Sequence, residues 1–516
     1  MTRRAVVSSF IFKFPPNRGP QVALFRRSAN VRTYPNHLAP VSGSIEKDDP
    51  SPLHAAWREI REETTLTPAT LTLLRQGKDY RFADEKIGRE WTIHPFAFRL
   101  KSHEDESLIQ VDWEHQGFQW FDPHDVRDVD EFGGVPRLAE SLRRIWFEIE
   151  LGESRGKVLS EGLLALQKDH ESGARQLAGK ALEVLVSVIS QKSGAEQDES
   201  LETWWRNSRL AAWHLWKNGR ESMGAAILNN IVRSLAIIEK EVKQVSDNKV
   251  TPGFLDTVAH KVRDYAASRS SSVDGIWKSF EGVLREEHGS GRPVRILTLS
   301  SSSTILECLH RAITSFDSEF DIRVLESRPL FEGVSMASKL VGRLRNSSKE
   351  REKRVDVSIY TDAAAAVASE NVDLVLIGAD LIDKNGSTSN KTGSLPAVLS
   401  AKHSSPNAKV LVLAENEKVL PYDAPATEEN DVEEVVASWR RDTTVQEAAS
   451  TILRSSQEGA TDEKRLKASV KNVYFEWVPS EFIDGYMFED GQKSSKDIAD
   501  LAGRIRREAD AFFSDV

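Results

Sequence analysis

The spacing of hydrophobic and polar residues divides the chain into three regions with different predicted structures. Alternating runs at 5–14 and 21–27, joined by the turn-rich sequence PPNRGP, predict two strands of a hairpin. Between Val158 and Val245, hydrophobic residues recur at helical spacing and strand patterns are almost absent. From Val294 onward, short hydrophobic runs alternate with helical segments, which is typical of a parallel sheet covered by helices. The pattern therefore predicts a multidomain protein of mixed α/β and α+β class.

Residues 43–66 combine a predicted helix with a cluster of acidic residues. From Pro52 onward, hydrophobic residues recur at the spacing of a helix that packs against a core. Glu59 and Glu63 are four residues apart and project from one face, with Glu62 in the same two turns. Carboxylates crowded in this way repel one another unless a cation joins them, and Mg²⁺ (or Mn²⁺) bridged to phosphate oxygens is the natural candidate. The alternative is a solvated acidic helix face.

This stretch resembles the Nudix box, whose pattern is G-x5-E-x7-R-E-U-x-E-E-x-G-U, where U is aliphatic. The matching residues are Gly43, Arg58, Glu59, Ile60, Glu62, Glu63 and Leu66. The loop before Arg58 is one residue longer than the pattern, so that Pro50 stands where the first Glu belongs, and Thr65 replaces the final Gly. The resemblance implies a Nudix α/β/α sandwich over residues 1–150 and a Mg²⁺-dependent hydrolase that cleaves a diphosphate linkage.

The Nudix resemblance also implies roles for individual residues. It assigns metal binding and catalysis to Glu59, Glu62 and Glu63, with Arg58 orienting the glutamates. Glu114 lies six residues before Trp120, where some family members place a further catalytic or metal-binding Glu; an exposed loop residue is the alternative. A strand over 91–100 and a helix from residue 136 to about 151 are expected to complete the domain, followed by a polar linker at 152–156.

Residues 372–393 suggest a second site. Six hydrophobic residues predict a strand buried on both faces, and the sequence then turns polar at Asp380. Ligands of open α/β sheets bind beyond the carboxyl ends of the strands. Asn385-Gly386 predicts a tight turn that brings Asn390 and Lys391 near Asp380. A carboxylate, an amide and an ammonium group at one strand end suit a phosphorylated sugar.

The order of GAD, a glycine turn and NK followed by Gly393 resembles the initiation factor 2B-related family. That family includes ribose-1,5-bisphosphate isomerase, methylthioribose-1-phosphate isomerase and the α, β and δ subunits of the translation exchange factor. The resemblance implies a helical domain over 157–290, a Rossmann-like parallel sheet over 291–516 and a homodimer formed by the C-terminal half. It also implies that Asp380 is catalytic and that Arg220, in the sequence GRESM, contacts substrate.

Three departures from this family leave the activity of the second half open. Ser300 stands where the isomerases carry a cysteine, and a hydroxyl is a far weaker acid than a thiol, whose pKa is about 8.5. Glu332 replaces a Gln, and Ser172 replaces an Arg. Cys308 lies two helical turns farther on and is expected to be a buried apolar residue. Isomerase activity, sensing of a sugar phosphate or nucleotide, and a purely structural role are the alternatives.

Further residues are candidates for binding phosphate. Ser300 and Ser301 lie between a predicted strand and its helix, where backbone N–H groups and hydroxyls can cradle an anion; helix capping is the alternative. Arg328 ends the next strand and is a candidate phosphate fork. Residues 421–470 are acidic and poor in aromatics, and we expect a mostly exposed insertion with a helix around 445–453.

Length and composition restrict the remaining possibilities. At 516 residues the chain is too long for one core, so two to four domains are expected. A net charge of −10 without a long basic run argues against a nucleic-acid surface. The single cysteine excludes an internal disulfide, and no apolar run approaches the length of a membrane span. The short apolar run near the N-terminus is interrupted by Lys13 and fits a strand better than a signal peptide, so a cytoplasmic location is predicted.

The pairing of the two resemblances suggests a substrate. Hydrolysis of phosphoribosyl pyrophosphate would yield ribose 1,5-bisphosphate, and cleavage of ADP-ribose would yield ribose 5-phosphate and AMP. Either product is a phosphorylated ribose that suits the second half. The alternative is a non-catalytic regulatory protein like an initiation factor 2B subunit, which binds initiation-factor partners and uses both pockets at most as sensors.

Overall fold

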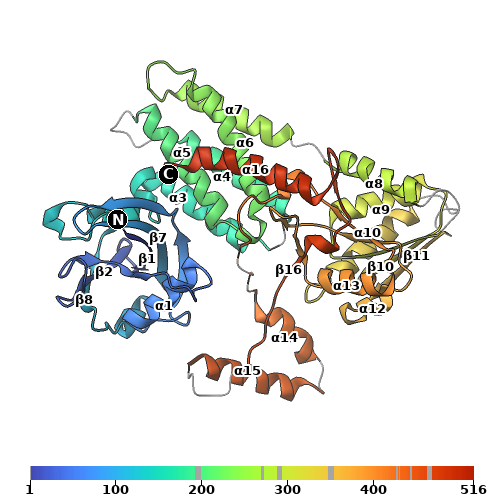
Figure 1. The fold of residues 1–516 in the computed structure, drawn as a ribbon, viewed down its shortest axis with the longest axis horizontal. Helices are drawn as coiled ribbons and strands as arrows, with labels where there is room; N and C mark the ends of the chain where they lie inside the picture. The colour runs from blue at the N-terminus through green and yellow to red at the C-terminus, as the bar shows by residue number, and fades with distance from the viewer. Residues whose placement is uncertain are drawn as a thin grey trace.

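The structure is a computed structural model that describes residues 2–170, 172–191, 199–268, 272–287, 293–346, 354–425, 428, 430–441, 444–461 and 468–516. Figure 1 shows an N-terminal domain built around a sheet, a bundle of helices in the middle and a second sheet flanked by helices. These are the fold classes and the order that the sequence pattern predicts.

The N-terminal domain is organised around an eight-stranded mixed sheet. Its main path is β3-β2-β1-β7-β5, with β4 paired to β1, β6 to β7 and β8 to β2. The strands are β1 (Thr2–Lys13), β2 (Gln21–Arg27), β3 (Leu38–Ala39), β4 (Val41–Ser44), β5 (Leu71–Gln76), β6 (Tyr80–Asp84), β7 (Arg89–Leu100) and β8 (His115–Phe121). Helix α1 (Pro52–Thr64) packs on this sheet through Ala55, Ala56 and Ile60. The predicted hairpin, early helix and strand at 91–100 are confirmed.

The single helix predicted at the end of this domain is wrong. Instead of one helix over 136–151, the chain forms α2 (Leu138–Arg143) and then α3 (Glu148–Lys168). The predicted linker at 152–156 lies inside α3. Gly152 has a φ of 74°, which glycine adopts without strain, so the helix axis breaks there and the helix then resumes.

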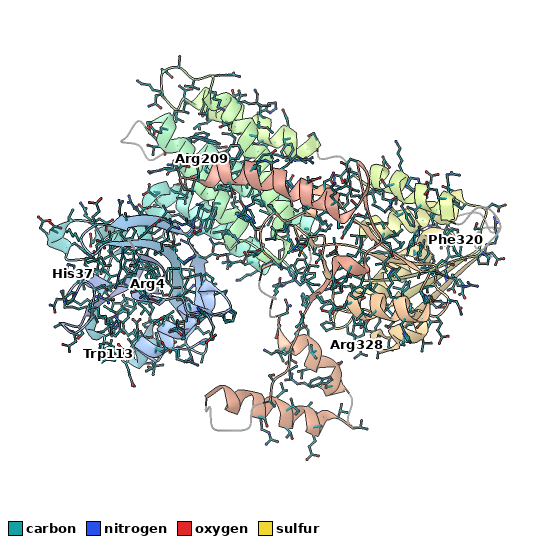
Figure 2. All side chains as sticks on the ribbon, viewed as in Figure 1. Arg4, His37, Trp113, Arg209, Phe320 and Arg328 are labelled. Atoms are coloured by element: carbon teal, nitrogen blue, oxygen red, sulfur yellow. The ribbon has the colours of Figure 1, made fainter. Side chains whose placement is uncertain are left out.

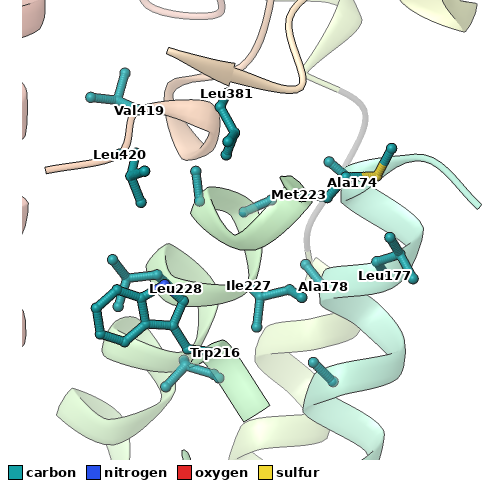
Figure 3. Close-up of a cluster of buried hydrophobic side chains, with 14 of the residues drawn as sticks. Ala174, Leu177, Ala178, Trp216, Met223, Ile227, Leu228, Leu381, Val419 and Leu420 are labelled. Atoms are coloured by element: carbon teal, nitrogen blue, oxygen red, sulfur yellow. The ribbon is translucent and has the colours of Figure 1, made fainter. Parts of the chain in front are cut away.

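The helical region is a bundle whose core continues into the C-terminal half. Its helices are α3, α4 (Ala174–Ser190), α5 (Leu201–Asn218), α6 (Gly224–Val242) and α7 (Pro252–Ser268). Helix α8 (Val273–Glu287) packs instead on the C-terminal half, where Ile276 and Phe280 share a core with Leu309. Trp204, Trp213 and Trp216 are buried in this core, where they act as packing residues. The polar sequence KSGAEQDES at 192–200 predicts a hinge within the helical region, and most of it lies outside the described residues. Figure 3 shows Met223 and Leu228 packed near Leu381 and Val419 of the C-terminal half.

The C-terminal half contains a seven-stranded sheet of order β11-β10-β9-β12-β15-β17-β18, parallel except for the last pair. Its strands are β9 (Val294–Leu299), β10 (Phe320–Leu325), β11 (Val355–Tyr360), β12 (Leu374–Ile377), β15 (Lys409–Leu413), β17 (Gly485–Phe488) and β18 (Gly491–Lys493). The flanking helices are α9 (Ser303–Ser315), α10 (Glu332–Arg345), α12 (Ala365–Ala368), α13 (Ser394–Ser404) and α16 (Ser495–Phe513). A small sheet of β13 (Leu381–Ile382), β14 (Thr388–Lys391) and β16 (Phe475–Val478) lies beyond the end of β12. The predicted parallel sheet is confirmed.

The predicted acidic insertion contains two helices rather than one. Helix α15 (Gln446–Thr461) confirms the predicted helix, whereas α14 (Val432–Arg441) was not expected. Both project from the body of the molecule in Figure 1. Val436 is fully buried, so the segment is not exposed throughout. Among the helices of the described ranges, none combines the length and apolar character needed to cross a membrane.

Polar contacts join the N-terminal domain to the rest of the chain. The backbone N–H of Gln76 donates to Asn218 Oδ1 at 2.7 Å, and Asn218 Nδ2 donates to the carbonyl oxygen of Gln76 at 2.9 Å. The Arg75 guanidinium forms two 2.8 Å bonds to Glu148 at the start of α3. Helix α16 crosses the bundle and brings Val516 to Arg144, which donates to its carbonyl oxygen at 2.6 Å (Figure 1).

Candidate functional site

Helix α1 carries the glutamates of the acidic cluster, and hydrogen bonds fix both of its ends. Ser51 caps the first turn, accepting a hydrogen bond from the backbone N–H of His54, and Pro52 follows at a position that needs no donor. Thr65 ends the helix with a φ of 62°, in the left-handed region that the expected Gly adopts more easily. Its hydroxyl donates to the carbonyl oxygen of Leu108 at 3.2 Å. The departure from the Nudix pattern therefore keeps the backbone geometry.

Gly43 lies directly against the carboxylate of Glu59. A Cβ atom at residue 43 would stand 1.9 Å from Glu59 Oε1, which is far inside any real contact distance. Glycine is therefore required at residue 43 so that the Glu59 carboxylate can lie against the backbone. This explains why the predicted pattern begins with a glycine.

Arg58 organises the acidic residues around it. Its Nη1 donates to Glu59 at 2.8 Å and to Glu62 at 3.1 Å. Its Nε and Nη2 donate to the two carboxylate oxygens of Asp49 at 3.2 and 2.9 Å. The hydrogen bonds from Arg58 hold the pKa of Asp49 below its usual range. The Nudix pattern, counted back from Arg58, places its first acidic residue at Pro50. In the structure the neighbouring Asp49 takes that role.

Glu63 is a buried carboxyl group without a hydrogen bond at its Oε2 atom. The nearest cationic candidate is His115, whose Nε2 lies 3.4 Å away. Burial raises the pKa of Glu63 well above the ordinary value, and Glu59, Glu114 and Asp112 add to this by repulsion. Burial also raises the pKa values of Glu59 and Glu114. These carboxylates repel one another across a small space, and their hard oxygen atoms suit a divalent cation.

The described residues contain no group of three or more His, Cys, Asp or Glu side chains close enough together to hold a metal ion. Of the predicted metal set, Glu59 and Glu114 line one cavity, and Glu63 is buried close enough to be repelled by both. Glu62 is half exposed and turned toward Arg58 instead. Glu59, Glu63 and Glu114 are therefore the candidate ligands, and their side chains would have to draw together around an ion, because as they stand they form no such group.

The cavity beside these carboxylates has a volume of about 340 Å³ and a second wall made of aromatic side chains. Tyr80 and Phe82 lie on one face of β6, with ring centroids 6.1 Å apart and planes inclined by 19°. Trp91 is paired with Phe82 across β6 and β7, which places it on the same face, and Tyr34 also lines the cavity. Two arginines, Arg27 and Arg89, also line the cavity.

A larger cavity of about 900 Å³ lies between the helical region and the C-terminal sheet. Asp380 follows β12, and Asn390 and Lys391 lie on β14 after the predicted tight turn, in which Gly386 has a φ of 92°. All three residues line the cavity, as do Arg220, Ser300 and Ser301. The structure therefore brings together six of the seven residues predicted for this second site.

The seventh, Arg328, does not line the cavity. Its Nε donates to Glu326 at 2.9 Å, and about half of its side chain is exposed at the outside of the C-terminal half (Figure 2). Its backbone N–H is instead held by Asp362 Oδ2 at 2.7 Å. The prediction that Arg328 forks a phosphate is therefore not supported by its position, because the strand-end loop turns its side chain away.

Charged groups of the second cavity are paired with one another. Lys391 Nζ lies 2.8 Å from Glu332 and 4.4 Å from the ring centre of Tyr474. Arg220 Nη2 lies 2.8 Å from Glu428. Burial raises the pKa of Asp380, although Lys418, Lys391 and Arg220 oppose this rise. A carboxyl group tuned in this way is a candidate for proton transfer.

The serine loop at the start of α9 is already engaged in local hydrogen bonds. The backbone N–H of Ser300, whose φ is 65°, donates to Ser327 Oγ at 2.8 Å. Ser302 caps α9 by accepting from the N–H of Ile305 at 3.2 Å. Cys308 is buried as expected, and burial raises the pKa of its thiol to about 12, so it does not replace the absent cysteine.

Sequence reasoning missed several residues of the second cavity. Lys418 follows β15 at the carboxyl edge of the sheet, and Glu415 and Lys339 also line the cavity. The rule that located Asp380 at the end of β12 would have located Lys418 after β15 as well. Ser172, in place of the family's Arg, lines the cavity and accepts from Lys180 Nζ at 3.1 Å. Glu171 lies outside the described residues.

These two sites define a two-part α/β protein with an acidic cavity in its first part and a mixed-charge cavity in its second. The chain belongs to the initiation factor 2 subunit family, whose family model matches residues 170–494. A NUDIX domain matches residues 3–145, so the N-terminal domain is a Nudix domain. Both resemblances stated from the sequence are confirmed.

Known proteins that are similar to the C-terminal part of the chain include isomerases. The chain is 28% identical over 324 residues to ribose 1,5-bisphosphate isomerase of Haloterrigena turkmenica, covering 62% of this chain and 85% of that protein. It is 28% identical over 168 residues to methylthioribose-1-phosphate isomerase of Bacillus cytotoxicus, covering 32% of this chain and 40% of that protein. A solved structure of translation initiation factor eIF-2B from Pyrococcus horikoshii OT3 matches 66% of this chain and 98% of that chain, with 20% identity and a TM-score of 0.41.

The Nudix domain indicates a hydrolase, and the isomerases among the relatives suggest enzyme activity in the second half. The homodimer, the initiation-factor partners and the cytoplasmic location stay predictions.

Proposed function

We propose that the Nudix domain hydrolyses the diphosphate linkage of a nucleoside diphosphate compound with the aid of Mg²⁺ or Mn²⁺. The proposal is carried by the buried Oε2 of Glu63. This atom accepts no hydrogen bond, lies 3.4 Å from His115 Nε2, and belongs to a carboxyl group that Glu59 and Glu114 repel. Keeping three carboxylates together in a partly buried place is unfavourable without a compensating cation.

The residues of this chain would divide the work as follows. Glu59, Glu63 and Glu114 would hold the ion, which when bound supplies charge stabilisation for a phosphoryl oxygen. A carboxylate of the cluster would accept the proton of the attacking water, and Glu63 is the candidate because burial raises its pKa above the ordinary value of a glutamate. Arg58 holds Glu59 and Glu62 in place, and Glu62 assists from the exposed side.

The aromatic wall favours a substrate that carries a base. Tyr80, Phe82 and Trp91 offer flat apolar faces in the same cavity as Glu59. Such faces bind a nucleobase by stacking and give little to a bare sugar. ADP-ribose therefore fits the cavity better than phosphoribosyl pyrophosphate, which has no base.

We further propose that the second half binds a phosphorylated ribose. Asp380, Asn390 and Lys391 converge at a strand end, where their carboxylate, amide and ammonium groups suit hydroxyls and phosphate. With a serine at residue 300 and Cys308 buried, a second acid for isomerisation is lacking at that loop. Binding without turnover is therefore the role that we assign to this cavity.

The test is a panel of substrates incubated with the full chain and Mg²⁺. ADP-ribose should be cleaved to AMP and ribose 5-phosphate, and Glu63→Gln should reduce kcat by at least about 100-fold. Glu85→Gln is the matched control, because Glu85 is exposed at the turn between β6 and β7. Wild-type turnover in Glu63→Gln would refute the assigned site. Turnover of no compound would favour the regulatory alternative.

A further inference from the structure

Arg220 is the most deeply buried cation of the second cavity, and its guanidinium is already occupied. Only 4% of its side chain is exposed. Its Nη1 donates to the carbonyl oxygen of Asp169 at 2.6 Å, and its Nη2 and Nε donate to Glu428 at 2.8 and 3.4 Å. The last contact spans 208 positions of the chain and comes from the acidic insertion.

Two other side chains converge on the same carboxylate. The hydroxyl of Ser222 donates to Glu428 Oε2, and His170 Nδ1 lies 3.7 Å from Oε1. An arginine fork, a hydroxyl and an imidazole that meet at two oxygen atoms form an arrangement suited to an anion, whether carboxylate or phosphate. Here the anion belongs to the protein itself.

The other deeply buried cation of the cavity has a carboxylate partner as well. The side chain of Lys391 is 6% exposed, and Glu332 lies 2.8 Å from its Nζ. The two most buried cations are therefore both neutralised from within the chain. The exposed Lys339 lines the same cavity and forms no ion pair among the described residues.

We propose that Glu428 occupies an anion subsite of the second cavity, so that a ligand with a phosphate at Arg220 must displace this carboxylate. Glu428 is then a specificity-determining residue that favours ribose monophosphates over ribose bisphosphates. The monophosphate binds with its phosphate toward Lys339 and Ser301 and its sugar hydroxyls toward Asp380 and Asn390. This inference rests on the proposed role of the second half as a sugar-phosphate-binding module.

The electrostatics of the cavity agree with this arrangement. Glu428 raises the pKa of Asp380 by repulsion, whereas Arg220 lowers it. The carboxylate of Glu428 is therefore close enough to act on the centre of the cavity. The Glu428 carboxylate would repel a phosphate that entered beside Arg220. Binding of both anions to Arg220 at once would be unfavourable.

The experiment compares full-length wild type with Glu428→Gln by calorimetric titration with ribose 1,5-bisphosphate, ribose 5-phosphate and inorganic phosphate. Glutamine keeps the shape of the side chain and removes its charge. The expected result is that ribose 1,5-bisphosphate binds at least about tenfold more tightly to Glu428→Gln, while ribose 5-phosphate changes less than about twofold. Glu433→Gln is the matched control, because Glu433 is an exposed acid of the same insertion that pairs with Arg440 instead.

The possible outcomes separate this inference from the proposed function. Equal ratios of bisphosphate to monophosphate affinity in wild type and Glu428→Gln would overturn the inference and leave the sugar-phosphate module intact. No binding of any of the three compounds to either protein would overturn both. If Glu428→Gln fails to fold, Glu428→Asp takes its place. The shorter side chain draws the carboxylate back from Arg220, and a smaller rise in bisphosphate affinity is expected.

Discussion

Gly43→Ala should damage catalysis in the Nudix domain while leaving its stability nearly unchanged. The new Cβ would lie 1.9 Å from Glu59 Oε1, and contacts shorter than 3.0 Å are essentially never seen. The carboxylate must therefore move by at least about 1.1 Å, the difference between these distances. Such a shift breaks the 2.8 Å bond from Arg58 to Glu59.

The magnitude follows from the kind of atom that must move. A displacement of about 1 Å in a catalytic group costs roughly 100-fold in rate. The atom in the way is the far end of a flexible side chain, so the backbone need not shift, and the cost in folding free energy should stay below about 1 kcal/mol.

The assay measures kcat and KM for ADP-ribose together with Tm. We expect kcat to fall about 100-fold with little change in KM, because the aromatic wall that holds the base is untouched. Gly19→Ala is the matched control, since no atom lies within 4 Å of the position its Cβ would take. A Gly43→Ala enzyme with wild-type kcat would refute the claim that Glu59 must stay against residue 43.

Three further predictions concern charge and burial. Asp49→Asn should lower kcat about 10- to 100-fold and raise the Mg²⁺ concentration needed for half activity, because Asp49 positions Arg58. An unchanged dependence on Mg²⁺ would contradict this prediction. A carboxyl group whose pKa is raised in the folded state destabilises the protein once the pH exceeds the pKa of that group in the unfolded chain. Without metal, Glu63→Gln should therefore melt at a higher temperature than wild type at pH 7.5 and at the same temperature near pH 4. An equal Tm at pH 7.5 would be evidence against this burial cost. Cys308 should resist a thiol reagent at pH 8 in the native chain and react fully in denaturant, since burial raises its pKa to about 12; rapid native labelling would show that the thiol is accessible.

The sequence predicted those parts of the sites that depend on local spacing. Glu59 and Glu63 share a helix face because they are four residues apart, and Asp380 was located because a buried strand ends there. Both inferences need only the geometry of one helix or one strand. The fold class was predictable for the same reason.

The sequence could not predict contacts that depend on loops or on distant segments. A pattern with fixed spacing placed the first acid at Pro50, whereas the loop folds so that Asp49 reaches Arg58. The sequence predicts a linker at Gly152, because sequence alone does not show whether a helix resumes after a glycine. Glu428 and Arg220 are 208 positions apart, and no local periodicity connects them.

The two cavities differ in whether their buried charged groups already have a partner of opposite charge. This difference predicts which added ion stabilises the protein. Beside the first cavity, Glu63 keeps a buried oxygen that accepts no hydrogen bond, so an added cation removes a cost that the folded chain now carries. In the second cavity, Arg220 already has its anion in Glu428, so an added phosphate only exchanges one partner for another. Addition of Mg²⁺ at neutral pH should therefore raise the Tm of wild type, whereas inorganic phosphate should raise it appreciably only in Glu428→Gln. A chain in which phosphate stabilises wild type and Glu428→Gln equally would not be using Glu428 as its own anion.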